Sequence, residues 1–188
     1  MADLYTQKLT PSELEYCAEN ELIYICPSTS TPEPFRFLCG NFGPLVAGVN
    51  VQVPLWLALT LKESNKARLI LPDWMRLARL QAAAAEEEDV DGLFAALPFH
   101  FVEVAEVILR AAEDDCAADG ESAEALSDQL QHIITLRERK LQKGMAQALA
   151  STKDPNIMDD LLIPISNVGA MEVAGLREGF MRVRGGAP

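Results

Sequence analysis

The chain has 188 residues, of which 49% are hydrophobic and 23% are charged, and its formal net charge is −12. Such a composition is typical of a folded globular protein and argues against a wholly disordered chain. An acidic surface repels phosphates, so the charge also argues against a protein that binds nucleic acid on its own.

The sequence gives no sign of membrane insertion or secretion. The longest apolar run, Val53 to Leu61, contains Pro54 and is far shorter than the roughly 20 residues that cross a bilayer. The N-terminal residues carry neither an apolar signal segment nor an arginine-rich transit pattern. We therefore expect an intracellular, soluble protein without membrane contact.

The sequence up to Val53 predicts a small region of one helix and three strands. Thr10 followed by Pro11 is typical of a helix start, and this helix is expected to bury Leu14, Cys17 and Ala18. Proline and hydroxyl residues at 27–34 predict a loop, and a turn cluster is expected at 40–44. β-Branched and aromatic residues predict strands at Leu22 to Cys26, Phe35 to Cys39 and Val49 to Val53.

From Pro54 onward the apolar periodicity changes to that of helices. A helix is predicted over Leu55 to Glu63, a short extended piece over Arg68 to Leu71, and further helices after Pro72, after Pro98 and from Ser122 to about Leu149. The stretch 111–121 is expected to end the helix after Pro98, and Ser166 or Asn167 to cap a final helix. The predicted buried faces are Trp74, Leu77, Ala78 and Gln81 after Pro72; Phe101, Val104, Ala105, Ile108 and Ala112 after Pro98; and Val173, Leu176, Phe180 and Val183 at the end.

The order of these elements predicts an α+β fold that is mainly α. A small β-rich domain is expected over residues 1–61, and a larger helical domain over 62–188 that ends in a short flexible tail. Five helices with broad apolar stripes carry more hydrophobic surface than so small a body can hide, which is typical of a subunit of an assembly.

Two charged segments allow a functional and a structural interpretation. The acidic run at 86–91 is interpreted as an exposed helix end or solvated loop. Arg137, Arg139, Lys140 and Lys143 form a basic patch on the longest predicted helix. This patch would contact an acidic partner or DNA phosphate, or it would be a solvated face whose cations suit the C-terminal half of a helix.

Catalytic and metal-binding motifs are not found in the sequence. Its four cysteines, Cys17, Cys26, Cys39 and Cys116, lack the clustered spacing of a zinc site, and we expect them to be buried or partly buried free thiols. Cys39 with a distant histidine is a weak candidate for a thiol nucleophile. The paired acids at 113–115 and 159–160 are interpreted as surface residues, and no cofactor is expected.

The run from Val51 to Met75 is the most specific part of the sequence. Its segments VPLWLALTLKE and RLILPDWM resemble, at matching spacing, the signature stretch of the Psf-two family of subunits of the GINS replication complex. Further similar segments follow in the family's order, LPFHFVEVAEVILRAAEDD, LRERKLQKGM and MDDLLIPISNVGAMEV. The residues that carry the match are Pro54, Leu55, Trp56, Leu57, Leu61, Lys62, Arg68, Pro72, Trp74 and Met75, and we take them as candidates for interdomain or subunit contacts.

The resemblance implies a fold and a function. The fold is a small β-rich domain followed by a helical one, joined by Trp56 and its leucines, with Arg68 to Met75 leading toward subunit interfaces. The function is that of a non-catalytic scaffold in a heterotetramer with three other GINS subunits, which joins the MCM ring and the Cdc-forty-five protein in the replicative helicase for initiation and fork progression. Membership implies a nuclear location and at most indirect contact with DNA. The alternative hypothesis is an independent DNA-binding factor that uses Arg137 to Lys143.

Overall fold

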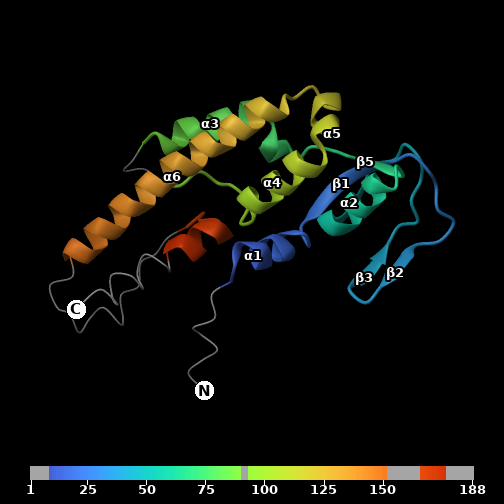
Figure 1. Cartoon of the computed structure of the whole chain (residues 1–188), viewed down its shortest axis with the longest axis horizontal. Helices are drawn as coiled ribbons and strands as arrows, with labels where there is room; N and C mark the ends of the chain where they lie inside the picture. The colour runs from blue at the N-terminus through green and yellow to red at the C-terminus, as the bar shows by residue number, and fades with distance from the viewer. Residues whose placement is uncertain (1–8, 90–92, 152–165, 177–188) are drawn as a thin grey trace, which may run out of the picture.

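The computed structural model of the chain describes residues 9–89, 93–151 and 166–176 (Figure 1). The helices of the first half are α1 (Pro11–Ala18), α2 (Leu55–Glu63), the short 3-10 helix η2 (Asp73–Met75) and α3 (Leu77–Glu87). Those of the second half are α4 (Phe101–Ala111), α5 (Glu113–Ala118), α6 (Ala123–Ser151) and a final helix at 170–176. None of the helices in the described ranges is both long and apolar enough to cross a membrane.

Three antiparallel strands form the main sheet, in the order β4 (Val51–Pro54), β1 (Leu22–Pro27), β5 (Ala67–Leu69). Ile23 pairs with Val53 of β4, and Ile25 pairs with Leu69 of β5. These four side chains are buried, whereas the alternate residues of β1 point to the opposite face. α2 follows β4 directly and packs against β1 and β5, so the predicted helix over Leu55 to Glu63 is confirmed.

A second, two-stranded sheet lies beside α2 at one end of the molecule (Figure 1). It consists of β2 (Phe35–Phe37) and β3 (Gly40–Phe42), joined by a tight turn at Leu38 and Cys39. The prediction of one strand to Cys39 followed by a turn at 40–44 is therefore wrong by a few residues. Gly40 has a φ of +145°, a conformation that glycine adopts readily. The chain can therefore reverse at residues 38 and 39, before the expected turn at 40–44.

The start of α1 is fixed by reciprocal hydrogen bonds. The hydroxyl of Thr10 accepts the backbone N–H of Glu13 at 3.3 Å, and the carboxylate of Glu13 accepts the backbone N–H of Thr10 at 2.7 Å. Leu14 and Ala18 are buried as predicted, but Cys17 is exposed. α1 packs against α4, and its buried face is formed by Leu14 and Ala18, one turn apart, so Cys17 lies to the side of that face.

The segment after Pro72 forms two helices instead of one. Arg76 is extended, with ψ of 141°, and separates η2 from α3. The break rotates the following helix, so Ala78 and Gln81 are exposed while Leu80, Ala83, Ala84 and Glu87 are buried. The predicted face is therefore wrong for Ala78 and Gln81, because it assumed uninterrupted helical spacing from Pro72, whereas Trp74 and Leu77 are partly buried and pack against the core.

The second half is built around α6, which runs alongside α3 (Figure 1). The predicted buried face of α4 is confirmed, and the hydroxyl of Ser122 accepts the N–H of Ala125 at the start of α6. The stretch 111–121, predicted to end a helix, contains a helix of its own, α5. Of the predicted last helix, the described part covers 170–176, where Val173 is exposed, contrary to prediction, and Leu176 is partly buried. The predicted positions Phe180 and Val183 lie outside the described residues.

The predicted fold class, α+β and mainly α, is confirmed. One continuous hydrophobic core extends from Ala18 through the sheet and α3 to Ile133 of α6. The division into domains at residue 61 stays a prediction, although β5, which follows that residue, belongs to the same sheet as β1.

Candidate functional site

The predicted contact residues between Pro54 and Met75 fall into two groups. Pro54, Leu55, Leu57, Leu61 and Met75 are buried in this chain's own core, so they hold the fold together and present no surface to a partner. Trp56, Lys62, Arg68, Pro72 and Trp74 are only partly buried. Among these ten predicted residues, any contact outside the chain therefore depends on the second group.

Trp56 anchors the β2–β3 hairpin to α2. Its ring meets Phe37 edge to face at 4.9 Å between centroids and Phe42 at 6.3 Å, with interplanar angles of 89° and 83°. Edge-to-face aromatic pairs at these distances stabilise by about 0.5–1.5 kcal/mol beyond area burial. The aromatic contacts of Trp56 thus lie in the hairpin, while the residue also packs against the common core, and its expected role as a joint to the helical region stays a prediction.

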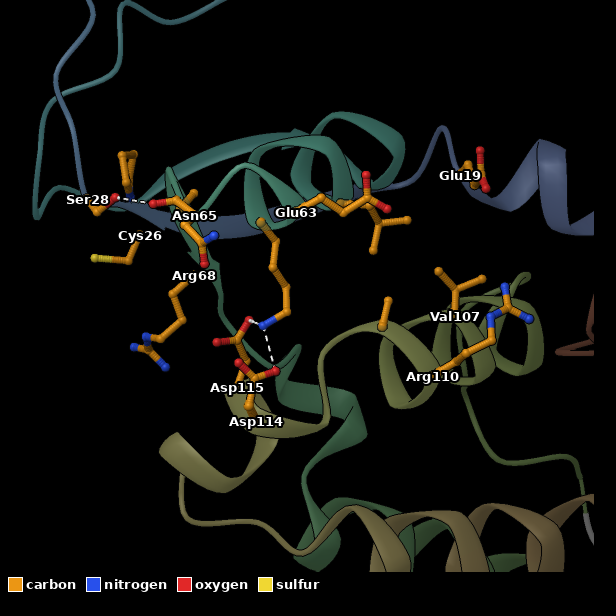
Figure 2. A pocket seen from close by; sticks show the side chains of 15 residues that line it. Glu19, Cys26, Ser28, Glu63, Asn65, Arg68, Val107, Arg110, Asp114 and Asp115 are labelled. Atoms are coloured by element: carbon orange, nitrogen blue, oxygen red, sulfur yellow. Dashed lines mark hydrogen bonds and ion pairs between the residues drawn. The ribbon is translucent and has the colours of Figure 1, made fainter.

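Lys62 and Arg68 line a groove of about 800 Å³ between α2, β5, α4 and α5 (Figure 2). Lys62 extends from the end of α2 toward α5, where its ammonium lies 2.7 Å from Asp114 Oδ1 and 2.8 Å from Asp115 Oδ2. Burial opposes the charge of Lys62, but the hydrogen bonds with Asp114 and Asp115 raise its pKa overall. A lysine held protonated in this way is unsuited to act as a base or nucleophile.

Two carboxylates, Asp115 in α5 and Asp119 directly after it, close the outer edge of β5. The backbone N–H of Leu69 donates to Asp115 Oδ2 and that of Leu71 to Asp119 Oδ2, both at 2.9 Å, while Ile70 N–H donates inward to the carbonyl of Tyr24. The carboxylates thus take the place of a further strand at an edge that would otherwise expose unpaired N–H groups. The interpretation of the acids at 113–115 as surface residues is wrong for Asp115, which is buried.

Arg68 reinforces the same junction. Its Nη1 lies 2.6 Å from Asp119 Oδ1, and this hydrogen bond raises the pKa of Arg68. For Asp119, burial opposes the charge, but the bonds from Arg68 and Leu71 hold its pKa below the ordinary range. Ion pairs in this groove therefore fasten α5 to the end of α2 and to β5.

A second charged cluster lies inside the helical region around Arg137. This guanidinium is fully buried and binds Glu172 through two bonds, of 2.7 Å from Nε and 2.9 Å from Nη2. Its Nη1 bonds Glu87 Oε1 at 2.6 Å, and Lys140 Nζ bonds Glu87 Oε2 at 2.9 Å. The Arg137 cluster, defined as Arg137, Lys140, Glu87 and Glu172, joins α3, α6 and the helix at 170–176.

The backbone and nearby rings complete this cluster. Arg137 also donates to the carbonyls of Ala95 and Asn167, and its guanidinium carbon lies 4.9 Å from the centroid of Phe94. Burial works against the charge of Arg137, but the carboxylates of Glu172 and Glu87 raise its pKa overall. Buried cations are retained when every donor finds a partner, and this one is fully paired.

The predicted basic patch is therefore corrected. Arg137 and Lys140 face inward and are neutralised by buried acids, whereas Arg139 and Lys143 are exposed. Glu87, assigned by its composition to a solvated acidic run, is also buried. Its spacing of three, four and seven residues from Ala84, Ala83 and Leu80 is the signal that could have placed it on the buried face.

Thiol and metal chemistry find little support in the described part of the chain. Cys17 and Cys39 are exposed, contrary to prediction, while Cys26 is partly buried and Cys116 buried. Burial raises the pKa of the Cys116 thiol, which disfavours the reactive thiolate. No group of three or more histidine, cysteine, aspartate or glutamate side chains that could hold a metal ion occurs among the described residues.

Comparison with known proteins connects this geometry to a family. Residues 10–70 match the PSF2 N-terminal domain, a segment that contains α1, both sheets and α2. The chain is 32% identical to the probable DNA replication complex GINS protein PSF2 of Caenorhabditis elegans. The alignment spans 135 residues, which are 72% of this chain and 72% of that protein. The chain belongs to the PSF2 family.

Other PSF2 proteins extend the similarity. The DNA replication complex GINS protein psf2 of Schizosaccharomyces pombe is 30% identical over 174 residues, 93% of this chain and 86% of that protein. The human PSF2 protein is 34% identical over 105 residues, covering 55% of this chain and 56% of that protein. The resemblance expected from Val51 to Met75 is thereby confirmed, and the N-terminal PSF2 match ends just before Pro72 and Trp74.

Proposed function

We propose that this chain is a non-catalytic scaffold subunit of the GINS complex and acts in DNA replication. One observation carries the proposal: the similarity to a protein named as a DNA replication complex GINS protein extends over 93% of the chain. The match covers both the sheet and the helical region, so it concerns the whole architecture and not a single shared motif.

The buried ionisable groups of the two charged clusters make structural contacts, which supports a non-catalytic role. Lys62, Asp115 and Asp119 fasten α5 to β5, and the Arg137 cluster joins three helices. Each of these charges is neutralised by a neighbour, whereas a catalytic group keeps a proton or lone pair available to a substrate. These paired clusters stabilise the packing of helices and sheet, as expected of a scaffold.

We further propose that the chain assembles with three other GINS subunits, and that this heterotetramer joins the MCM ring and the Cdc-forty-five protein. In that assembly it would stabilise the replicative helicase in the nucleus during initiation and fork progression. The net charge of −12 and the inward-facing Arg137 and Lys140 favour protein contacts over direct contact with DNA.

Co-expression tests this proposal. We expect the chain to purify with the three other GINS subunits of its own organism as a 1:1:1:1 complex, measured by size-exclusion chromatography with light scattering. The same chain expressed alone is expected to be prone to aggregation and to stay soluble only when dilute. A stable monomer that ignores the three subunits would contradict the proposal.

A DNA-binding measurement separates the alternative hypothesis. Fluorescence anisotropy measures binding of a labelled DNA duplex to the complex. We expect that replacing Arg139 and Lys143 leaves any binding unchanged. Tight, salt-dependent binding lost on Arg139→Glu with Lys143→Glu would favour the independent DNA-binding factor instead.

A further inference from the structure

A second hollow, of about 320 Å³, opens on the face of the sheet opposite the buried side chains of β1. Leu22 and Tyr24 of β1 are half exposed there, because they alternate with the buried Ile23 and Ile25. The hollow is completed by Ile70, directly after β5, and by Trp74 of η2, with the turn before α4 as its far wall. We call it the Trp74 pocket.

The Trp74 pocket combines aromatic surface with negative charge. Its described lining includes Tyr24 and Trp74 together with the carboxylates of Glu21 and Asp73, and it contains no lysine or arginine. Glu21 makes no ion pair within the described part of the chain. The side chain of Asp73 is 95% exposed and approaches Arg76 only at 3.5 Å.

The tyrosine and tryptophan rings of this pocket stack on no other ring or cation among the described residues. Neither Tyr24 nor Trp74 makes a ring–ring or cation–ring contact with another described residue. Elsewhere the same chain places a cation over aromatic rings, since the guanidinium of Arg137 lies 4.9 Å and 5.3 Å from the centroids of Phe94 and Phe101. Aromatic faces flanked by carboxylates are the surroundings in which a cation is held best.

We propose that the Trp74 pocket binds an arginine side chain presented by a partner protein. A guanidinium stacks flat on an aromatic ring and at the same time directs N–H groups to carboxylates, which a lysine ammonium cannot do in one geometry. Glu21 and Asp73 supply the carboxylates, and Tyr24 and Trp74 supply the rings. The overall charge of −12 adds long-range attraction for a basic segment.

Fluorine NMR tests the proposal with a built-in control. The chain has two tryptophans, and Trp56 packs against the β2–β3 hairpin and does not line the Trp74 pocket. The full chain is labelled with 5-fluorotryptophan, kept as dilute protein free of partner subunits so that the pocket is open, and titrated with N-acetyl-arginine methylamide. We expect a saturable shift of the Trp74 signal and a constant Trp56 signal, with assignments from Trp56→Phe.

Matched probes and variants define the chemistry. The isosteric but uncharged citrulline derivative is expected to give no saturable shift, and the lysine derivative a weaker one. Glu21→Gln with Asp73→Asn should weaken arginine binding roughly threefold to thirtyfold. Glu19→Gln with Glu63→Gln, which removes the same charge from the groove of Figure 2, should leave it unchanged.

Three results would overturn the proposal: equal shifts with citrulline, equal weakening by both double variants, or no saturation by arginine at millimolar concentration. The partner is tested separately with a photo-crosslinking residue in place of Gln52, an exposed part of the pocket wall. Crosslinks from the assembled complex should map to a segment that contains arginine. Crosslinks to segments without arginine would contradict the partner assignment, whereas the titration does not depend on GINS membership.

Discussion

The carboxylate of Asp115 accepts the backbone N–H of Leu69, at 2.9 Å across 46 residues of sequence. The same oxygen accepts from the ammonium of Lys62 at 2.8 Å, so one buried acid closes a strand edge and neutralises a cation. The adjacent Asp114 binds Lys62 as well, but its side chain is 78% exposed where that of Asp115 is 9% exposed. Asp114 and Asp115 thus bind the same lysine from different environments, so substituting each in turn separates the buried contact from the exposed one.

Replacing Asp115 by alanine is expected to lower the free energy of unfolding by about 2–3 kcal/mol, since the N–H of Leu69 and Lys62 both lose a charged partner. Asp114→Ala should have little effect, because that side chain is largely exposed and its pairing is screened by water. Urea denaturation measures both values, and amide hydrogen exchange should accelerate at Leu69 in the first variant. Equal destabilisation by the two substitutions would contradict a specific role of Asp115 at the strand edge.

Arg137→Met is expected to destabilise the chain by about 3–5 kcal/mol, because it leaves the buried carboxylates of Glu87 and Glu172 without their cation. Arg137→Lys should also be poorly tolerated, because an ammonium cannot reproduce the two-bond contact with Glu172. Arg139→Met, on the exposed side of α6, is the control and should change stability by less than about 0.5 kcal/mol. Thermal unfolding followed by circular dichroism distinguishes these outcomes.

Glu103 is expected to make stability depend on pH. Both of its carboxylate oxygens are buried, and neither forms a hydrogen bond of normal length and angle with a described residue. Nδ1 of His100 lies 3.9 Å from Glu103 Oε1. Burial raises the pKa of Glu103 above its ordinary value of 4.5. The folded state therefore holds the proton more tightly than the unfolded state, and stability falls as pH rises from 4.5 through the raised pKa.

Glu103→Gln mimics the protonated form and should remove this dependence. We expect it to stabilise the chain by about 1–3 kcal/mol at pH 8 and to have little effect at pH 4. Glu138→Gln, at an exposed position of α6, should give the same small effect at both values. Urea denaturation across pH 4 to 8 is the measurement, and a Gln variant that is less stable at pH 8 would indicate that the charged form is favoured.

Trp56→Ala is expected to release the β2–β3 hairpin from α2, since the ring contacts of Trp56 lie on Phe37 and Phe42. The loss in stability should be about 2–4 kcal/mol, at or below the range for aromatic truncation in a core because Trp56 is only partly buried. Limited proteolysis with chymotrypsin should then cut near Phe37 and Leu38. Tyr16→Ala removes a largely exposed ring of α1 and should leave the cleavage pattern unchanged.

The elements of this chain could largely be predicted from apolar spacing, because periodicity records which face of a helix or strand is buried. α2 and the buried face of α4 agree with the predictions. The kink at Arg76 escaped prediction because one extended residue leaves the composition unchanged while rotating every later side chain of α3. The helix α5 was not predicted because its acidic residues indicated an exposed end of the preceding helix. Asp115 and Asp119 instead accept the backbone N–H groups of Leu69 and Leu71.

The charged clusters were harder to predict than the core. Asp115 and Leu69 are 46 residues apart, and Arg137 and Glu87 are 50 apart, so no local pattern indicates that they meet. Hydrophobic burial is a property of one side chain and its helix face, whereas an ion pair depends on the packing of two elements. A basic run such as Arg137 to Lys143 therefore suggested a surface, although two of its four cations are internal.

The Arg137 cluster also constrains the order in which the protein is completed during synthesis. Glu87 leaves the ribosome 50 residues before Arg137, but Glu172 follows Arg137 by a further 35. Until that last segment emerges, α3 and α6 meet around a guanidinium that lacks its two-bond partner. A nascent or truncated chain ending after α6 would thus hold Arg137 and Glu87 without the carboxylate of Glu172, and the helix at 170–176 completes the Arg137 cluster.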